Sequence, residues 1–211
     1  MRPCPLCACE PARKGFDGGM KTFWGCVAIV AVAGLVLTSH ASARAAPAQI
    51  IFLRHAEKPL IGSELDKRGW ERATALAKLF TQDPRALEHG PAVAIYAMKA
   101  EKSHDSVRAI QTMEATAHAL HLKIKTKYLR DDIDDLVAAI RKNKEVDGKT
   151  VIICWEHKMI PEMLKAFGWT DGPRKWDGDS YDRLWVLDFE NGKPARFRDL
   201  PQKILSGDSQ Q

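Results

Sequence analysis

Short apolar runs alternate with amphipathic helical patterns along the chain from residue 49 onward. The apolar runs cover 49–53, 92–98, 122–128, 150–155, 183–189 and 195–199, and the helical patterns cover 66–82, 103–120, 133–140 and 160–167. This alternation is typical of a mainly parallel sheet with helices on both of its faces. We therefore expect an α/β fold built as a three-layer α/β/α sandwich.

Residues that are typical of helix ends and turns support these helix and strand boundaries. Asp66 is placed to cap the first helix, which the Asp-Pro step at Asp83 ends, and Gly168 is placed as the stop of the last helix. The Asn191-Gly192 pair favours a tight turn between the last two apolar runs. The sheet is therefore expected to close with an antiparallel hairpin at its C-terminal edge.

Three lysines, Lys123, Lys125 and Lys127, alternate with apolar residues in the run 122–128. A period of two is the pattern of a half-exposed strand. A row of lysines also discourages pairing with another sheet. We interpret the row as a solvated edge of the sheet rather than as a binding surface.

The N-terminal part of the chain has the features of a secretory signal. A fifteen-residue apolar run, 23–37, follows Lys21 and precedes a stretch of small residues up to position 46. As a helix it reaches about 22 Å, short of the roughly 30 Å hydrocarbon core. We expect residues 1–19 to be an over-extended start, 20–45 to be a signal peptide and 46–211 to form a single domain. The domain is then secreted or periplasmic, with an uncleaved membrane anchor as the alternative.

Composition and cysteine positions exclude several classes of protein. A chain with 45% hydrophobic and 28% charged residues is expected to fold, and a net charge of +5 is too small an excess to indicate nucleic-acid binding. Cys4, Cys7, Cys9 and Cys26 all lie in the N-terminal segment, which leaves Cys154 alone in the predicted domain. No internal disulfide is therefore expected there, and no structural zinc site, since a second pair of ligands is missing.

Two histidines follow apolar strands at similar junctions. The run 49–53 leads into Arg54-His55, and the run 150–155 leads into Glu156-His157. In an open α/β sheet, ligands bind outside the carboxyl ends of the strands, so both imidazoles are expected at one rim. Helix N-termini that face the same rim suit an anion.

The residues at these junctions resemble a known family. Arg54-His55-Ala56-Glu57 after an apolar strand is similar to the Arg-His-Gly/Ala motif of the histidine phosphatase superfamily, whose fold is phosphoglycerate mutase-like. Further similar segments are Leu65-Asp66 with Gly69, Arg72 and Ala73, then Arg108-Ala109 with Gln111-Thr112, and Val151 to Ile153 leading to His157. Order and spacing agree over residues 49–167. The chain thus resembles a compact phosphatase of this superfamily.

The resemblance implies roles for five residues. His55 is the expected nucleophile, which forms a phosphohistidine that water hydrolyses. Arg54 and Arg108 are expected to bind phosphate oxygens, because guanidinium groups match them bidentately. His157 is expected to stabilise the charge of the transition state. Asp131 is expected to be the general acid, because Leu129-Arg130-Asp131 is closest to the Leu-x-Glu pattern of the family.

The sequence departs from the family in two places, and the acid has alternatives. Residues 102–107 replace the usual Ser-Pro run before Arg108, and Trp155-Glu156 precedes His157 in place of Gly or Ser. These departures leave the identity of the substrate undetermined, more than the type of reaction. The other carboxylates considered for the acid are Asp132, Asp134, Asp135, Glu57 and Glu156, of which the first three also suit the start of a helix.

The leading interpretation is an exported phosphatase, a phosphoric monoester hydrolase acting on small phosphorylated substrates. A mutase is disfavoured, because residues 109–156 leave little room for the insertions of such enzymes. A phosphohistidine phosphatase and a non-catalytic phosphate-binding protein remain alternatives. No metal or cofactor is expected, no nucleic-acid partner, and no stable membrane association after cleavage, whereas the sequence leaves the oligomeric state open.

Overall fold

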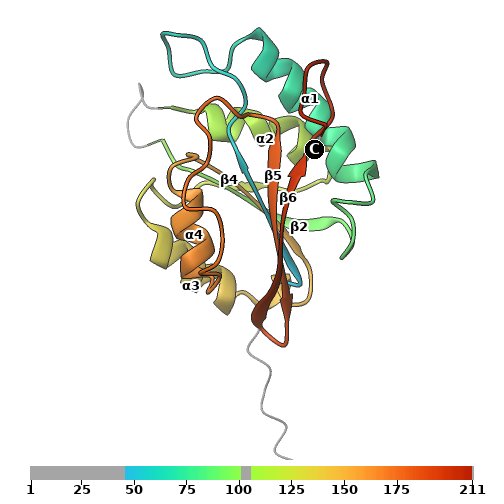
Figure 1. Cartoon of the computed structure of the whole chain (residues 1–211), viewed down its shortest axis with the longest axis vertical. Helices are drawn as coiled ribbons and strands as arrows, with labels where there is room; N and C mark the ends of the chain where they lie inside the picture. The colour runs from blue at the N-terminus through green and yellow to red at the C-terminus, as the bar shows by residue number, and fades with distance from the viewer. Residues whose placement is uncertain (1–45, 101–105, 211) are drawn as a thin grey trace, which may run out of the picture. The chain divides into compact units, whose positions relative to one another are not determined.

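A single mixed sheet forms the centre of the protein (Figure 1). The structure is a computed structural model that describes residues 46–100 and 106–210. These residues belong to one compact unit, His40–Gln211. The expected over-extended start and the expected signal peptide, 1–45, lie outside the described residues.

The strands and helices alternate as the sequence pattern predicted. The strands are β1 (Gln49–Arg54), β2 (Ala92–Ala97), β3 (Ile124–Lys125), β4 (Thr150–Trp155), β5 (Arg183–Glu190) and β6 (Lys193–Pro201). The helices are α1 (Lys67–Gln82), α2 (Arg108–Ala119), α3 (Ile133–Lys142) and α4 (Ile160–Ala166), with a short 3-10 turn at Lys144–Val146.

The sheet order is β3-β2-β4-β1-β5-β6. Strands β3, β2, β4 and β1 are parallel to one another, β5 is antiparallel to β1, and β6 is antiparallel to β5. Strands β1 and β4 are direct neighbours, and Arg54 is paired with Trp155 at their carboxyl ends. The chain therefore leaves both strands at the same edge of the sheet. His55 follows one strand there, and His157 follows the other.

Helices cover the two faces of this sheet. Phe52 of β1 contacts Phe167 just after α4, with ring centroids 5.9 Å apart. The next residue, Leu53, is paired with Cys154 of β4, which lies against Thr112 of α2. Because successive side chains of a strand point to opposite faces, α2 and α4 lie on opposite sides of the sheet. The predicted three-layer α/β/α sandwich is confirmed.

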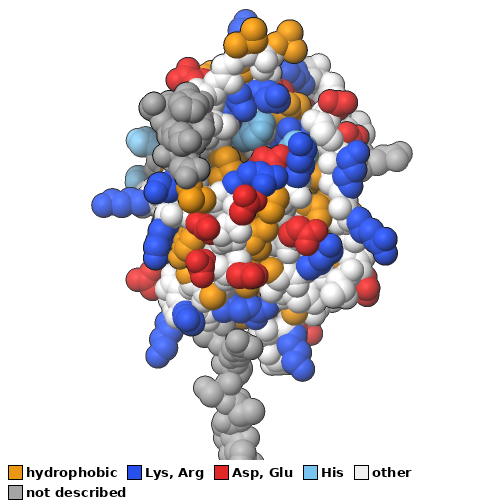
Figure 2. All heavy atoms as spheres, turned by 90° about the vertical axis from the view of Figure 1, so that its left-hand side faces the viewer, with side chains coloured by type: hydrophobic (Ala, Val, Ile, Leu, Met, Phe, Trp, Pro, Cys, Tyr) orange, Lys and Arg blue, Asp and Glu red, His pale blue; other side chains and the backbone are white. Residues whose placement is uncertain are grey.

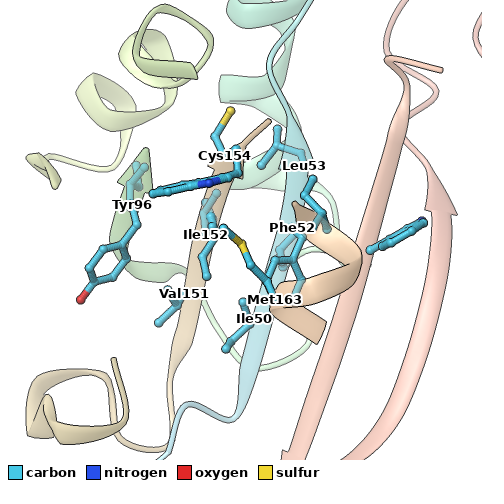
Figure 3. Close-up of a cluster of buried hydrophobic side chains, with 14 of the residues drawn as sticks. Ile50, Phe52, Leu53, Tyr96, Val151, Ile152, Cys154 and Met163 are labelled. Atoms are coloured by element: carbon cyan, nitrogen blue, oxygen red, sulfur yellow. The ribbon is translucent and has the colours of Figure 1, made fainter. Parts of the chain in front are cut away.

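The core is built on the two central strands. All six residues of β1 and all six of β4 are buried. Figure 3 shows side chains of β1, β2 and β4 together in this cluster, with Met163 of α4 lying over β1 and β4. Burial of each large apolar side chain contributes about 1.5–3 kcal/mol, so these strands dominate the stability of the fold.

The expected caps and turns are present. The Asp66 side chain accepts a hydrogen bond from the Gly69 amide at 2.7 Å and so caps α1. Gly168 adopts a φ of 97° directly after α4, and Asn191 and Gly192 adopt φ values of 51° and 75° in the hairpin between β5 and β6. These positive φ values are the ones that a tight hairpin turn requires.

Two boundaries differ from the sequence-based expectation. Helix α2 begins at Arg108 rather than near 103, because Val107 is outside the helix and its amide donates to the carbonyl of Ser63. Strand β3 is only two residues long and pairs with Ile95 and Tyr96 alone. It does lie at the edge of the sheet, where the lysine row was expected.

The described residues lie within one compact unit that has its own sheet and hydrophobic core. All six strands and the large hydrophobic cluster lie between residues 46 and 210. A segment with its own sheet and core is able to fold alone, which makes 46–211 a suitable unit for experiments. Within the described part of the chain, no helix combines the length and the apolar character that crossing a bilayer requires.

Candidate active site

His55 is held as a neutral imidazole at the end of β1. The ring is buried, and its Nδ1 lies 2.7 Å from the carbonyl oxygen of Ala56. A carbonyl only accepts, so Nδ1 carries the proton and Nε2 keeps its lone pair. Burial lowers the pKa of His55 to about 4, and the charges of Arg54, Arg108 and His157 act in the same direction. This is the protonation state that a nucleophile needs at neutral pH.

Arg54 carries a buried charge beside this ring. Its Nη1 donates to the carbonyl oxygens of Gly178 at 2.5 Å and Ser180 at 3.3 Å, and its guanidinium lies 3.9 Å from the centre of the Tyr181 ring. Burial lowers the pKa of Arg54, but a guanidinium stays protonated in proteins. No described residue accepts a hydrogen bond from Nη2. Arg54 therefore retains a charged donor for an anion.

Arg108 joins the site from the first residue of α2. Its Nε donates to the Glu64 carbonyl at 3.0 Å, its Nη2 donates to the carbonyl of Gly62, and its Nη1 contacts the Ser106 hydroxyl at 3.3 Å. Its charge reaches His55 and helps to lower the pKa of that imidazole. Arg108 thus supplies positive charge to the site and also holds the segment between β1 and α1 in place.

His157 joins the site from the residues that follow β4, the strand next to β1. Its Nδ1 is 3.2 Å from Glu156 Oε1, without the alignment of a hydrogen bond. Burial lowers the pKa of His157, and the charges of Arg54, Lys158 and Lys58 lower it further against the opposing effect of Glu156. The structure therefore brings His157 into one charged cluster with Arg54, Arg108 and His55.

Asp131 is not part of this cluster. Its carboxylate is 73% exposed and lies 2.5 Å from Nη1 of Arg130, in the turn before α3. Arg130 also reaches Glu156 at 3.2 Å, so Glu156 is the carboxylate that stands between Asp131 and the imidazole of His157. Asp132, another candidate from the sequence, accepts a hydrogen bond from the amide of Leu129. The assignment of Asp131 as the acid stays a prediction.

A loop that the sequence analysis missed forms one wall of the site. Residues 177–181 provide the carbonyls that bind Arg54 and the ring that covers it. The indole nitrogen of buried Trp176 donates to the Ser180 carbonyl at 2.9 Å and fixes the loop. A Cβ added to Gly178 would lie 4.0 Å from Nε2 of His157, so the loop also touches the second imidazole. The Asp- and Gly-rich composition of the loop gave no signal for this role.

Glu57, two residues after His55, holds the motif in position. Its carboxylate binds the buried Arg72 at 2.8 Å, and Arg72 in turn binds Asp208 at 2.8 Å. Burial opposes the charge of Arg72, but the hydrogen bonds of Glu57 and Asp208 raise the pKa of the guanidinium above its ordinary value. Residues from the N-terminal motif, α1 and the C-terminal tail are thereby tied together.

The backbone of the motif also fits closely against α1. A Cβ on Gly69 would lie 2.3 Å from the carbonyl oxygen of Glu57, a separation that real atoms do not show. The Asp66 amide donates to the same oxygen at 3.1 Å. Gly69 is therefore required by this contact.

The surface above the cluster is cationic and hollowed. Figure 2 shows His side chains in a depression near the upper end of this face, with Lys and Arg side chains around them. A separate cavity of about 470 Å³ adjoins Tyr181 and is lined in part by Glu57, Arg72 and Asp208, but by none of Arg54, His55, Arg108 and His157. Among the described residues there is no group of three His, Cys, Asp or Glu side chains that could hold a metal ion.

Solved structures share this arrangement of strands and helices. The protein histidine phosphatase SixA complexed with tungstate matches with a TM-score of 0.52 at 13% identity, over 73% of this chain and 97% of that chain. A putative alpha-ribazole-5'-P phosphatase from Escherichia coli matches with a TM-score of 0.51 at 11% identity, over 76% and 98%. The chain has the histidine phosphatase fold.

The alpha-ribazole phosphatase from Shigella flexneri has the same fold, with a TM-score of 0.50 at 12% identity, over 72% of this chain and 96% of that chain. No family model matches the sequence, and no curated protein matches it either. The phosphoglycerate mutase-like fold expected from the sequence is thus confirmed by structure alone. At these identities the shared fold does not assign a substrate.

The ion pairs of Arg72 give a test of how the motif is held. Arg72→Met leaves the carboxylates of Glu57 and Asp208 without their buried partner, so we expect a loss of about 3–5 kcal/mol in the free energy of unfolding. Arg68→Met is the matched control, because Arg68 meets the same carboxylates but is 45% exposed, and it should cost about 1 kcal/mol or less. Urea unfolding measures the free energy of unfolding of both variants. Equal losses of stability in the two would contradict the buried network of ion pairs.

The buried imidazole of His55 predicts a pH-dependent stability. Its pKa is about 4 in the folded protein against 6.5 for the ordinary group, so the unfolded chain binds more protons between these values. The free energy of unfolding should therefore fall from pH 6.5 toward pH 4, by up to about 3 kcal/mol from this residue. Urea unfolding at several pH values should show a shallower slope for His55→Gln. An unchanged slope in that variant would show that His55 is not buried as a neutral ring.

Proposed function

We propose that this protein is a phosphatase that hydrolyses phosphomonoesters through a phosphohistidine on His55. The observation that carries the proposal is a buried, neutral imidazole whose Nδ1 is bound to the Ala56 carbonyl and whose pKa is lowered by burial and by nearby Arg54, Arg108 and His157. A phosphate dianion requires cations around a nucleophile that is not itself protonated. The shared fold with phosphatases, one of them solved with the oxyanion tungstate, supports this reaction class.

The first step transfers the phosphoryl group to the protein. The Nε2 lone pair of His55 attacks phosphorus, the phosphorus–oxygen ester bond breaks, and the leaving oxygen takes a proton from an acid or from water. In this proposal Arg54 and His157 bind the oxygens that gain charge, which stabilises the transition state. The Ala56 carbonyl accepts from Nδ1 and stabilises the positive charge that develops on the ring.

The second step releases phosphate. Water attacks the phosphorus atom, the phosphorus–nitrogen bond breaks, and its electron pair returns to Nε2, which restores neutral His55, while the protons of the water leave with the phosphate. The two guanidinium groups of Arg54 and Arg108 balance the two negative charges of a phosphate dianion, so we propose that the reaction uses no metal and no cofactor.

The location of the protein is a separate proposal. We propose that residues 20–45 direct export and that the domain 46–211 acts outside the cytoplasm, because the run 23–37 and its flanks have the pattern of a signal peptide. A single buried thiol, Cys154, suits an oxidising compartment, because burial raises the pKa of this thiol and keeps it unreactive.

A narrower substrate range is the second candidate, and the exposure of Asp131 favours it. A strong general acid is needed for an alkoxide leaving group but not for a good leaving group. If neither Asp131 nor Glu156 donates the proton, turnover is confined to activated esters and to phosphoramidates such as phosphohistidine. At the extreme of a narrow substrate range, the protein would bind phosphate and hydrolyse no ester.

Replacing the nucleophile tests the main proposal. His55→Ala should lower kcat/KM for p-nitrophenyl phosphate by about 10³-fold or more, because the variant lacks the Nε2 that attacks phosphorus. His118→Ala, an exposed histidine on α2, is the matched control and should keep full activity. Rapid quenching of the wild-type protein should also trap an acid-labile, base-stable phosphoenzyme. A His55→Ala protein with more than about a tenth of wild-type activity would refute the mechanism.

The dependence of turnover on the leaving group identifies the general acid. Asp131→Asn and Glu156→Gln are each compared with wild type on p-nitrophenyl phosphate and on an alkyl phosphate. The variant that lacks the true acid should lose about 10²-fold or more of its turnover on the alkyl ester and little on the nitrophenyl ester. Similar losses on both esters would exclude that residue as the acid. Absence of turnover on any ester, with phosphate still bound, would favour the binding protein.

A further inference from the structure

Two large aliphatic side chains stand fully in solvent beside the candidate active site. Leu60 is 103% exposed and Ile61 is 92% exposed, in the segment Lys58-Pro59-Leu60-Ile61-Gly62 between β1 and α1. This segment, which we call the apolar tip (58–62), extends beyond the end of β1 at the upper left of Figure 1. Adjacent aliphatic side chains that contact nothing in their own fold indicate a site of interaction.

The apolar tip is held outward by its base. The carbonyls of Gly62 and Glu64 accept hydrogen bonds from Arg108, and the Ser63 carbonyl accepts from the Val107 amide at 3.2 Å. The Leu65 amide donates to the Gln111 side chain at 3.0 Å. These bonds fix the base of the tip to the start of α2. Because Arg108 is also part of the charged cluster, the tip stands at the rim of the site.

Cations lie at this rim, together with the exposed carboxylate of Glu64 at the base of the tip. The charges of Lys58 and Lys158 both lower the pKa of His157, which places their ammonium groups near the mouth of the site. Arg54 and Arg108 add two further charges within it. The carboxylate of Glu57, which lies next to Lys58 in the chain, is already neutralised by Arg72. Figure 2 shows hydrophobic side chains at the upper end of this face, with Lys and Arg side chains and a few Asp or Glu side chains around them.

We propose that the apolar tip docks the mouth of the site reversibly on an anionic lipid surface. Apolar side chains that insert among lipid headgroups, next to lysines that attract anionic lipids, are the two features by which proteins bind a membrane surface. A protein partner is less suited, because a stable interface buries about 800 Å² on each side and two side chains on a protruding tip supply little of that. The docking goes beyond the proposed phosphatase activity and does not depend on it.

Docking of this kind differs from anchoring. Two inserted side chains and a few lysines give a weak contact that salt reverses, whereas a spanning helix gives a permanent one. It is therefore compatible with the expectation that the domain 46–211 has no stable membrane association. The contact sets the mouth of the site at the level of the lipid headgroups.

Vesicle flotation tests the proposal on residues 46–211, which contain the whole described sheet and core. The vesicles are phosphatidylcholine with and without phosphatidylglycerol, at low and high salt. Wild type should float with the anionic vesicles at low salt, and the double variant Leu60→Ser/Ile61→Ser should partition about tenfold or more weakly. Lys58→Gln should weaken only the binding to anionic vesicles. Trp70→Ser is the matched control, an apolar residue 41% exposed outside the tip, and should bind as wild type does.

The same proteins are assayed on soluble p-nitrophenyl phosphate, and their folding is checked by circular dichroism. Unchanged turnover in Leu60→Ser/Ile61→Ser, together with lost flotation, separates docking from catalysis and supports the proposal. Wild-type protein that stays with neither vesicle overturns it, and so does equal flotation of wild type and double variant. Sedimentation that shows a wild-type dimer and a monomeric double variant, without flotation, would assign the tip to a second copy of the chain instead.

Discussion

The pairing of β1 with β4 is the constraint on which the candidate site depends. Arg54 lies opposite Trp155 in this parallel pair, so the residues that follow the two strands emerge side by side. A slip of one residue in the register would turn every side chain of a strand to the other face of the sheet. Both strands are buried throughout, which makes such a slip costly. The relative position of His55 and His157 is therefore set by the most stable part of the core.

The second constraint is the way in which the protein balances a buried cation. Carbonyl oxygens and an aromatic face, rather than a carboxylate, surround the guanidinium of Arg54. A carboxylate at that place would have stabilised a protonated imidazole nearby and would have competed with a bound anion. Neutral oxygens compensate the charge only partly, so the positive potential remains available and adds to burial, the main cause of the low pKa of His55.

The sequence predicted the architecture well because periodicity and turn chemistry act locally. The strand 150–155, the Asp66 cap and the Asn191-Gly192 turn were all correct. The start of α2 was placed too early, because the bond from Val107 to Ser63 joins segments that sequence spacing cannot connect. The loop 177–181 was missed for the same reason, since its function comes from backbone carbonyls, which carry no residue signature. Asp131 was chosen by order along the chain, whereas its position depends on how Arg130 pairs.

The close contact at Gly69 has a consequence for motion within the site. The backbone of the Arg-His motif rests directly on the first turn of α1, with no side chain between them to compress or rotate. We therefore expect a displacement of that turn to move the peptide groups beside His55. The C-terminal tail is joined to the same place, because Arg72 binds both Glu57 and Asp208.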